Sequence, residues 1–574
     1  MIRVLTARDD ALLIELDDLD QAVALYESLT TDPLRGVGVP VPGARTLLVP
    51  FRPSAITAQA LAAELRTRPL ERRATSAART VEIPVRYDGE DLAEAAELLG
   101  WSTDELVRRH TAAAWTVGFV GFAPGFAYLT SDDPELVVPR RASPRTRVPA
   151  GSVALAGPYS GVYPRESPGG WQLVGRTDAP VWDVTRDRPA LMLPGDEVRF
   201  VPLPAGPTAP AGPPEPGTDP GGATAGGSAA GGTAGDSGSS GGAARGNGVE
   251  VVRVGVQALV QDLGRPGSEG AGVSASGALD RPSLRAANCA VGNPSDAAAI
   301  ESVGGLRLRA RGPQVLAVTG AAGDVVVRPG PGGPDKTGAC RPDRRPRPGE
   351  PFALDDGDEL RLAPPTRGVR VYVAVRGGID VPPVLGSRST DVLAGLGPEP
   401  LGAGDVLPVG VPARGLPAAG PSSVAATGTP GDDRSGTGGT PPSGGLPAVG
   451  EVTELPIVLG PRDDWFDDAA LTRLTGQDWV VTPRSNRVGL RLDGEPVARV
   501  RDKEGAELPS EGCVTGAIQM PPDGLPVLFL ADHPLTGGYP VIGAVVAGHV
   551  PLAGQLPAGA RVRFTIQNHP GGTP

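Results

Sequence analysis

The chain has 574 residues, so a typical size of about 150 residues per domain predicts about four folding units rather than one. Hydrophobic residues make up 40 % of the chain and aromatic residues 4 %, which indicates cores built from Val, Leu, Ala and Ile. The net charge of −12 argues against a nucleic-acid partner or a polybasic membrane anchor. With no apolar run of about 18 residues either, we expect a cytoplasmic, soluble protein with no membrane partner.

Two segments are too poor in bulky apolar side chains to fold by themselves. The chain holds 83 Gly and 65 Pro, and many of them fall in 204–248 and 412–450. Such segments bury too little apolar surface to offset the entropy of ordering. We therefore predict a disordered Pro/Gly linker at 204–248, which joins two lobes, and a low-complexity insert at 412–450.

Apolar periodicity predicts a small α+β unit over residues 1–78. The alternating runs at 2–6, 11–16 and 45–51 are typical of strands, and the 3.6-residue spacing in 19–29 is typical of a helix. A second helix is expected over 55–66, with Ser54 as its N-cap.

A second unit is expected over residues 79–203. It opens with a strand at 79–86 and two helices, Leu92–Leu99 before Gly100 and Thr103–Ala113 after a Ser102/Glu105 capping box. His110 lies on the apolar side of the second helix, where a core histidine is favoured over a catalytic base. Beyond residue 116, short apolar runs between Gly and Pro predict an all-β barrel or sandwich.

The lobe at 249–566 is again expected to consist mostly of short strands. One pattern recurs: a glycine turn followed by an alternating strand, at Gly195, Gly357, Gly404 and Gly559. This is either a common β-turn or a sign that several barrels end in the same way.

Few residues suit covalent or metal chemistry. Cys289, Cys340 and Cys513 are far apart and form no zinc motif, and the four histidines lack metal-ligand spacing. The metal is therefore left open. Only Lys336 and Lys503 could carry a biotinyl or Schiff-base group, and neither stands in a biotinylation motif.

Arginine and small polar residues do suit the binding of anions. Four arginines between 139 and 148 precede a Gly/Ser-rich stretch, and arginine captures carboxylate or phosphate in a bidentate manner. The alternative is a solvated arginine face. Polar islands recur in the second lobe, at 261–265, 274–280, 288–293 and 385–391, but no nucleophile–base pair is evident.

Several motifs then stand in a recognisable order. The first lobe carries GFVGFAPGFAYL (118–129), VPAGSV (148–153) and SPGGWQLVGRT (167–177), and the second carries VRGGID (375–380), LGSRSTD (385–391), GAIQ (516–519) and TGGYP (536–540). In these motifs the two lobes resemble, in chain order, the B and C subunits of 5-oxoprolinase. These domains are also called allophanate hydrolase subunits 1 and 2, and they form the carboxyltransferase domain of urea carboxylase. The chain therefore resembles a B–C fusion with 204–248 as the joint.

The resemblance implies a mainly β fold with α+β parts: tandem cyclophilin-like β-barrel domains behind the N-terminal α+β unit, with an active site between the lobes. It implies an enzyme that opens 5-oxoproline to L-glutamate with ATP hydrolysis, through a phosphorylated lactam. ATP with Mg²⁺ and a separate A subunit are expected, and the oligomeric state is left open.

The resemblance also carries over site residues. Asp262, Asp280 and Arg176 are the expected catalytic residues, with either aspartate serving a metal or a proton. The residues expected to bind substrate or nucleotide are Arg140, Arg147, Gln172, Gln261, Arg265, Asn288, Asn293, Arg388 and Tyr539.

Two other functions remain open from the same resemblance. One is a biotin-dependent carboxyltransferase of the urea carboxylase type; it would need carboxybiotin from another protein, because this chain has no biotinylation motif. The other is a non-catalytic regulator of a sensor histidine kinase. Allophanate hydrolysis itself is disfavoured, since the Ser/Lys set of an amidase is missing.

Overall fold

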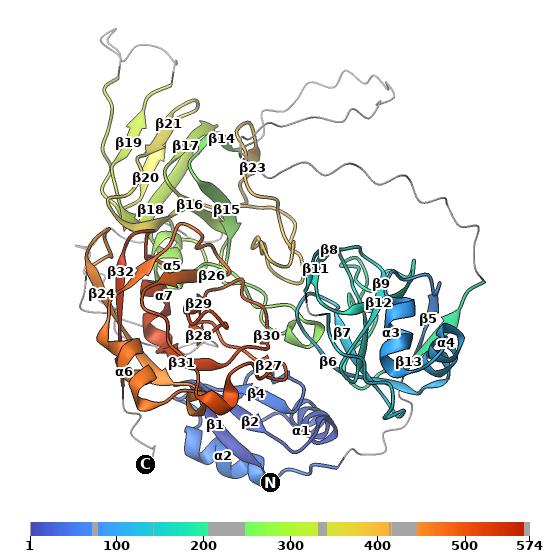
Figure 1. Ribbon diagram of the computed structural model, residues 1–574. Helices are drawn as coiled ribbons and strands as arrows, with labels where there is room; N and C mark the ends of the chain where they lie inside the picture. The colour runs from blue at the N-terminus through green and yellow to red at the C-terminus, as the bar shows by residue number, and fades with distance from the viewer. Residues whose placement is uncertain are drawn as a thin grey trace, which may run out of the picture.

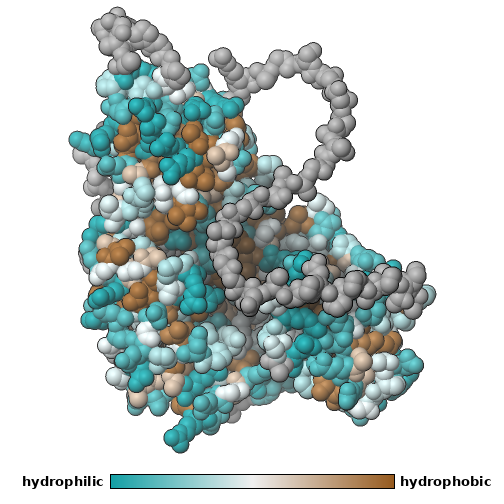
Figure 2. Space-filling model, turned by 45° about the horizontal axis from the view of Figure 1, so that its top comes forward, coloured by the Kyte–Doolittle hydropathy of each residue, from teal (hydrophilic) through white to brown (hydrophobic). Residues whose placement is uncertain are grey.

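The computed structural model describes residues 2–71, 79–141, 143–204, 247–330, 341–412, 415 and 445–567. Nearly all of the predicted linker at 204–248 and insert at 412–450 lie outside the described residues, as do Lys336, Cys340 and His569. The described chain is mainly β and forms four bodies, a small α+β unit, a first barrel, a β-sandwich and a second barrel (Figure 1). Within this described part, no helix is long and apolar enough to cross a membrane. On the face shown in Figure 2, hydrophobic side chains stand in small patches among hydrophilic ones.

The N-terminal unit has a four-stranded sheet covered by two helices. The helix α1 (Leu19–Thr31) confirms the prediction for 19–29, and Asp18 caps it by accepting a hydrogen bond from Gln21 N. The second helix begins later than predicted. Thr57, not Ser54, is its N-cap, because the Thr57 hydroxyl accepts the Ala60 N–H at 3.2 Å. The elements are β1 (Arg3–Arg8), β2 (Ala11–Glu15), β3 (Val41–Pro42), β4 (Thr46–Pro50) and α2 (Ala58–Thr67), in sheet order β1-β2-β4-β3.

The first barrel is a seven-stranded sheet that curls until its edges meet. The backbones of Arg86 and Arg176 exchange two hydrogen bonds of 2.9 Å, which join the end of the first strand to the opposite edge. In sheet order the strands are β12 (Gln172–Arg176), β9 (Ser152–Ala156), β10 (Tyr159–Val162), β7 (Ala127–Ser131), β6 (Trp115–Val120), β13 (Glu197–Pro202) and β5 (Thr80–Val85). A separate ribbon pairs β8 (Arg145–Val148) with β11 (Ser167–Gly169).

Both predicted helices of this barrel are confirmed. The helix α3 (Leu92–Leu99) ends at Gly100, whose φ of 71° favours glycine. The helix α4 (Thr103–Ala112) begins at Ser102, whose hydroxyl accepts the Glu105 N–H at 3.1 Å. Only half of the capping box forms, because the Glu105 carboxylate pairs with Arg108 and Arg109 instead.

His110 is a core histidine, as predicted. It is fully buried, with one ring nitrogen 2.7 Å from the Tyr87 hydroxyl and the other 2.9 Å from the Ser160 hydroxyl. Its ring stacks on Phe200 at 4.3 Å. Burial lowers the pKa of His110 from 6.5 to about 3, so the folded protein holds it neutral at physiological pH.

This histidine predicts a pH dependence of stability. Below pH 6.5 the unfolded chain binds a proton at His110 that the folded protein refuses down to about pH 3. The free energy of unfolding should therefore fall as the pH falls through this window, by up to about 1.4 kcal/mol per pH unit. Urea unfolding at several pH values should show a shallower fall for His110→Gln than for the natural chain. Parallel curves would contradict the assignment.

The second lobe contains two bodies, and the first is a β-sandwich. One sheet has the order β19 (Val325–Arg328), β21 (Glu359–Leu362), β17 (Leu306–Arg311), β14 (Gly248–Val254) and β23 (Val406–Pro408). The other has the order β15 (Gln257–Gln261), β16 (Ala299–Val303), β22 (Arg367–Val375), β18 (Gln314–Ala322) and β20 (Phe352–Leu354). Their inner faces share one core, and the helix α5 (Arg281–Ala290) covers β18 and β22.

The second body is a closed seven-stranded barrel. Its strands are β24 (Val452–Leu459), β31 (Val541–Val545), β28 (Ala517–Gln519), β29 (Val527–Phe529), β26 (Gly489–Asp493), β25 (Trp479–Val481) and β32 (Arg561–Ile566). The helices α6 (Asp468–Gly476) and α7 (Val550–Ala553) pack on it, and β27 (Glu511–Gly512) pairs with β30 (Thr536–Gly537) at one side. The sequence predicted mostly short strands for 249–566, and it did not predict the division into two bodies or the helices α5 and α6.

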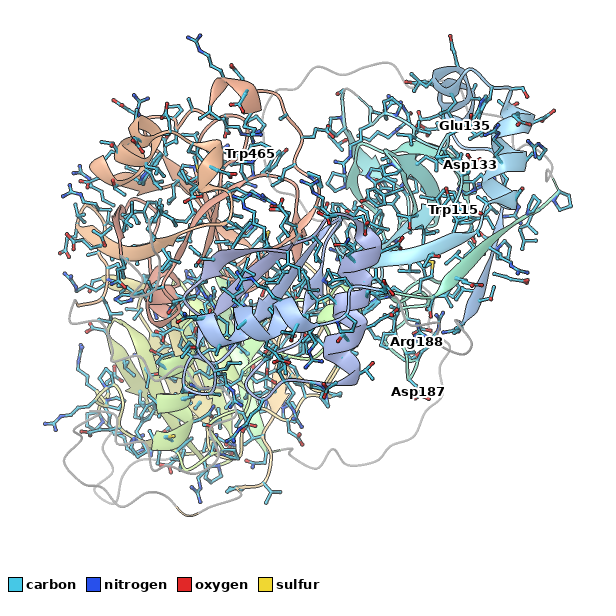
Figure 3. The ribbon with its side chains drawn as sticks, turned by 90° about the horizontal axis from the view of Figure 1, so that it is seen from below. Trp115, Asp133, Glu135, Asp187, Arg188 and Trp465 are labelled. Atoms are coloured by element: carbon cyan, nitrogen blue, oxygen red, sulfur yellow. The ribbon has the colours of Figure 1, made fainter. Side chains whose placement is uncertain are left out.

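The two barrels share one topology, which confirms the predicted tandem. Reading each sheet from its first strand in the chain, β5-β13-β6-β7-β10-β9-β12 corresponds to β24-β32-β25-β26-β29-β28-β31. In both, the first and last strands pair in parallel. In both, a tryptophan that follows a helix donates from its indole to that helix: Trp115, marked in Figure 3, to His110 O and Trp479 to Leu474 O.

The recurring glycine turns are real, but only two of them end a barrel. Gly195, Gly357, Gly404 and Gly559 all adopt φ between 83° and 97°, which favours glycine. Gly195 and Gly559 precede β13 and β32, the closing strands of the two barrels. Gly357 and Gly404 precede sandwich strands, so the turn chemistry is shared more widely than the barrel topology.

The N-terminal unit packs on the second barrel. Apolar residues of β1, β2 and β4 share a core with β24, β28 and β31, including Leu13, Leu48, Val458 and Ala544. The Arg8 guanidinium donates to Thr515 O, and the Asp9 carboxylate accepts from Ala547 N at 2.9 Å. Figure 1 shows this unit beneath the second barrel, with the first barrel to one side. The N-terminal unit therefore packs on the second barrel, although the first barrel follows it directly in the chain.

Candidate functional site

The aromatic segment 118–129 of the first barrel lies against the second lobe. Gly125 N donates to Ala271 O at 3.0 Å, and the Arg165 guanidinium donates to Leu393 O. A Cβ at Gly121 would overlap the Thr536 hydroxyl, so the backbone approaches the second barrel closely there. The contact between the lobes therefore combines the 118–129 segment with the loops around 271, 393 and 536.

Aromatic rings gather behind this contact. Tyr128 stacks on Phe119 with 4.2 Å between ring centroids and meets Trp171 edge-on at 5.4 Å. The Tyr128 hydroxyl hydrogen-bonds with Ser510 of the second barrel. Burial raises the pKa of Tyr128, and it raises that of Tyr159 to about 12, so both hydroxyls stay protonated.

Two of the predicted binding residues, Arg140 and Gln172, come from segments near this cluster in the chain. The positive charge of Arg140 acts on Tyr128 and opposes the effect of burial on its pKa. Arg140 is exposed, and no carboxylate of the described residues lies within 4 Å of it. Gln172 is buried; its Nε2 is 3.5 Å from Pro139 O, whereas its Oε1 has no hydrogen-bond partner in the described part of the chain. The charge of Arg140 thus acts on the aromatic cluster, whereas Gln172 pairs with Leu155 of the barrel core and lies beside Pro139.

Arg147 and Arg176 lie on the surface of the same barrel. Their side chains are 75 % and 63 % exposed, and they pair with Glu166 and Asp88, each at 2.7 Å. Arg176 ends β12 at the seam where the barrel edges meet. Surface pairs of this kind are weak, so both guanidinium groups can exchange partners. Their catalytic and binding roles stay predictions.

Asp262 organises a loop of the second lobe. It is buried, and its carboxylate accepts from the Ser387 hydroxyl and the Arg388 N–H, each at 2.6 Å, and from the Ser389 hydroxyl. The far end of this 385–396 loop receives the hydrogen bond of Arg165. The contacts of Asp262 thus hold the loop that touches the first barrel, and its predicted catalytic role stays untested.

The neighbours of Asp262 act on the same loop. The Gln261 amide donates to Thr390 O at 2.8 Å, and buried Arg265 donates to Ser389 O and lies 3.8 Å from Asp391. Arg388 turns outward to Val381 O and Asp380. In this part of the chain the structure brings the predicted residues together around one loop.

The remaining predicted residues lie elsewhere. Asp280 is the N-cap of α5, with its carboxylate accepting from Ser283 and from the Gln555 amide. Asn288 and Asn293 bond to each other at 3.1 Å and fix the turn after α5. Tyr539 is 45 % exposed beside β30. These contacts explain local structure, and none of them is made with a residue of the aromatic cluster.

Sequence reasoning missed a buried ionic network that joins the sandwich to the second barrel. The Arg487 guanidinium bonds to both oxygens of Asp532, at 2.9 and 3.0 Å, and to Glu301. Asp532 also accepts from the Ser276 hydroxyl at 2.6 Å. Glu301 interrupts an apolar strand, and a charged residue in such a strand was the one sequence signal that could have indicated this network.

The donor sets show which groups the site can hold. Among the described residues, no cluster of three or more His, Cys, Asp or Glu side chains could hold a metal ion. Asp262 and Asp280, the predicted metal or proton carriers, are saturated by protein donors. Arg140 offers a guanidinium to an anionic group, and the buried Gln172 Oε1 is an acceptor with no partner among the described residues.

Two barrels of one topology, with the aromatic segment of the first in contact with the second barrel and with the ordered loop of the sandwich, define a tandem-barrel protein with an inter-lobe contact. The carboxyltransferase domain family, subdomains C and D, matches residues 2–192, and its subdomains A and B match residues 271–566. The chain belongs to the carboxyltransferase domain family.

Curated relatives include subunits of 5-oxoprolinase and urea amidolyases. The 5-oxoprolinase C subunit of Escherichia coli K12 is 33 % identical over 320 residues, which cover 55 % of this chain and 90 % of that protein. The 5-oxoprolinase B subunit of Escherichia coli O157:H7 is 50 % identical over 131 residues, 22 % of this chain and 60 % of that protein. Urea amidolyase of Lachancea kluyveri is 32 % identical over 330 residues, 55 % of this chain but only 17 % of that protein.

A solved structure matches nearly the whole chain. The crystal structure of TTHA0988 superposes with a TM-score of 0.74 at 32 % identity and covers 98 % of this chain and 100 % of that one. The arrangement of both lobes in one chain is therefore shared with a known structure. The match supports the fold, because that name states no activity.

Proposed function

We propose that this chain is the fused B and C component of an ATP-dependent 5-oxoprolinase, which works with a separate A subunit to convert 5-oxoproline to L-glutamate. The observation that carries the proposal is that one chain resembles both subunits, each at 33 % identity or more. A protein with the role of the B subunit alone, or of the C subunit alone, would need only one of the two lobes.

The chemistry of the inter-lobe site suits such a substrate. 5-Oxoproline has a carboxylate and a lactam N–H, which match the Arg140 guanidinium and the buried Gln172 oxygen. A lactam carbonyl is a poor electrophile, so transfer of the γ-phosphoryl group of ATP to its oxygen, with release of ADP, would activate it. Water then opens the ring and phosphate leaves. Exposed Arg147 and Arg176 are the residues of this chain that we expect to neutralise phosphate charge.

The test is ADP release by the purified chain with and without 5-oxoproline, followed by glutamate formation when an A subunit is added. We expect ADP release to rise with the lactam and glutamate to appear only in the mixture. Failure of both with an A subunit known to be competent would overturn the proposal.

A carboxyltransferase of the urea carboxylase type is the second candidate. The match to urea amidolyase favours it, and the family itself is named for carboxyl transfer. The same inter-lobe site would then hold carboxybiotin carried on another protein. Transfer of labelled carboxylate from free carboxybiotin to urea, without ATP, would favour this reaction over lactam opening.

A further inference from the structure

A charged cavity lies between the N-terminal unit and the second barrel. Its volume is about 880 Å³, inside the range of about 300–1,000 Å³ usual for small-molecule sites. One wall comes from β1 and the residues after β2, and the other from the segments around 462–465 and 502–511. This cavity is distinct from the inter-lobe site, and Ser510 lies between the two. The neighbours of Ser510, Pro509 and Glu511, line the cavity, while the Ser510 side chain meets Tyr128.

The floor of this cavity is an ion triad. The Arg462 Nε lies 3.0 Å from each oxygen of Glu511, and its Nη2 lies 3.0 Å from Glu15 Oε1. The three side chains are 5 %, 8 % and 14 % exposed, so water screens them weakly. Two carboxylates share one buried guanidinium, which leaves the floor with an excess negative charge.

The rim carries both signs of charge, since Arg3 also lies 3.5 Å from Asp464 and Lys503 lies 3.8 Å from Asp502. Arg3 is 3.2 Å from Glu15 Oε2 and Arg45 is 3.5 Å from Glu15 Oε1, yet their side chains are 53 % and 51 % exposed. Lys503, one of the two lysines in the chain, lies 5.8 Å from the ring centroid of Trp465. Trp465, labelled in Figure 3, and Leu508 add apolar wall between the charges.

This alternation of charge selects the ligand. A simple anion would meet the Glu15 and Glu511 carboxylates and four further lining acids, and a simple cation would meet Arg3, Arg45 and Lys503. The four further acids are Asp17, Asp464, Asp502 and Glu507. An uncharged apolar molecule would displace water from the charged groups without offering them hydrogen bonds in its place. Only a molecule that carries an ammonium and a carboxylate a few atoms apart finds a partner for each charge.

We propose that this cavity binds a free α-amino acid, with the ammonium against Glu15 and Glu511, the carboxylate against Arg45 and Arg3, and the side chain along Trp465 and Leu508. The site is independent of the proposed function, because it lies in a different cavity. 5-Oxoproline lacks an ammonium group and is not a ligand of this cavity.

Calorimetric titration of the full chain tests the proposal with L-leucine, L-glutamate, glutarate and butylamine as probes. We expect saturable binding of both amino acids and none of glutarate or butylamine, which each lack one charge. Arg45→Glu should weaken L-leucine binding by at least about tenfold, since it turns the carboxylate partner into a repulsive charge. Leu508→Trp, which fills the apolar wall, should weaken it as well.

The control is Arg347→Glu, a reversal at a side chain that is 84 % exposed on the sandwich, and it should leave binding unchanged. If the folded natural chain binds neither amino acid at ligand concentrations up to about 10 mM, the proposal is wrong. Equal binding of glutarate, or unchanged L-leucine affinity in Arg45→Glu, would also overturn it. L-Leucine is not a product of lactam opening, so its result does not depend on the outcome of the oxoprolinase assay.

Discussion

Arg487→Met is expected to lower the free energy of unfolding of the second lobe by about 3–5 kcal/mol, because it strands two buried carboxylates. Arg487 is 1 % exposed, and its partners Glu301 and Asp532 are 2 % and 0 % exposed. Its Nη2 also donates to Gly277 O at 2.6 Å, so four contacts disappear together. Calorimetry should show the melting temperature of this lobe falling by about 10 °C.

The matched control is Arg484→Met, three residues away in the same loop but exposed, which should change the melting temperature little. Adding Glu301→Gln and Asp532→Asn to Arg487→Met removes the stranded charges and should recover part of the loss. A melting temperature of Arg487→Met equal to that of the control would show that the network contributes nothing net to stability.

Local features of the fold could be predicted because they depend on neighbours in the chain. The helices at 19–31 and 103–112 follow from apolar spacing and a capping side chain, and the helix at 92–99 follows from apolar spacing and the glycine at its end. The Ser54 cap was wrong because Thr57 offers the same chemistry three residues later, and pattern alone does not separate the two. The helix α5 was missed because only Leu284, Ala287 and Asn288 of its ten residues are buried, so its apolar face is short.

The packing of the bodies could not be predicted. β1 and β2 carry apolar residues on both sides, since Leu13 faces the second barrel while Leu12 and Ile14 face the helices of its own unit. A strand buried on both faces gives no signal that names its partner. The shared topology of the barrels had a weak signal in Gly195 and Gly559, but the same turn at Gly357 and Gly404 obscured it.

The candidate site shows the same division. Motif resemblance identified Arg140, whose charge acts on the aromatic cluster, and Gln172, which lies beside Pro139. It also identified Asp262 and Asp280, whose contacts fix a loop and a helix terminus. A motif indicates that a residue matters, but it does not separate a chemical role from a positioning role. For Asp262 and Asp280 the distinction comes from their carboxylate oxygens, which already accept hydrogen bonds from the protein. Arg165 and Ser510, which join the lobes, became evident only when distant segments met.

Arg140→Ala is expected to reduce 5-oxoproline-dependent ADP release at low 5-oxoproline concentration by about 10–100-fold, because the charged partner of the substrate carboxylate is lost. This expectation rests on the proposed function and on the position of Arg140, an exposed guanidinium whose charge acts on Tyr128. Because its side chain makes no ion pair with the described residues, folding should be unaffected, and the melting temperature should match that of the natural chain.

Arg140→Lys separates charge from shape in the same assay. Lysine keeps the positive charge but cannot grip a carboxylate with two parallel N–H groups, so we expect activity between those of Arg140→Ala and the natural chain, with the loss mainly in KM for 5-oxoproline. Arg188→Ala, on the first barrel where Asp196 is its partner, is the control and should keep full activity. Full activity of Arg140→Ala would remove this residue from the site, whereas equal losses in Arg140→Ala and the control would indicate a disturbed barrel.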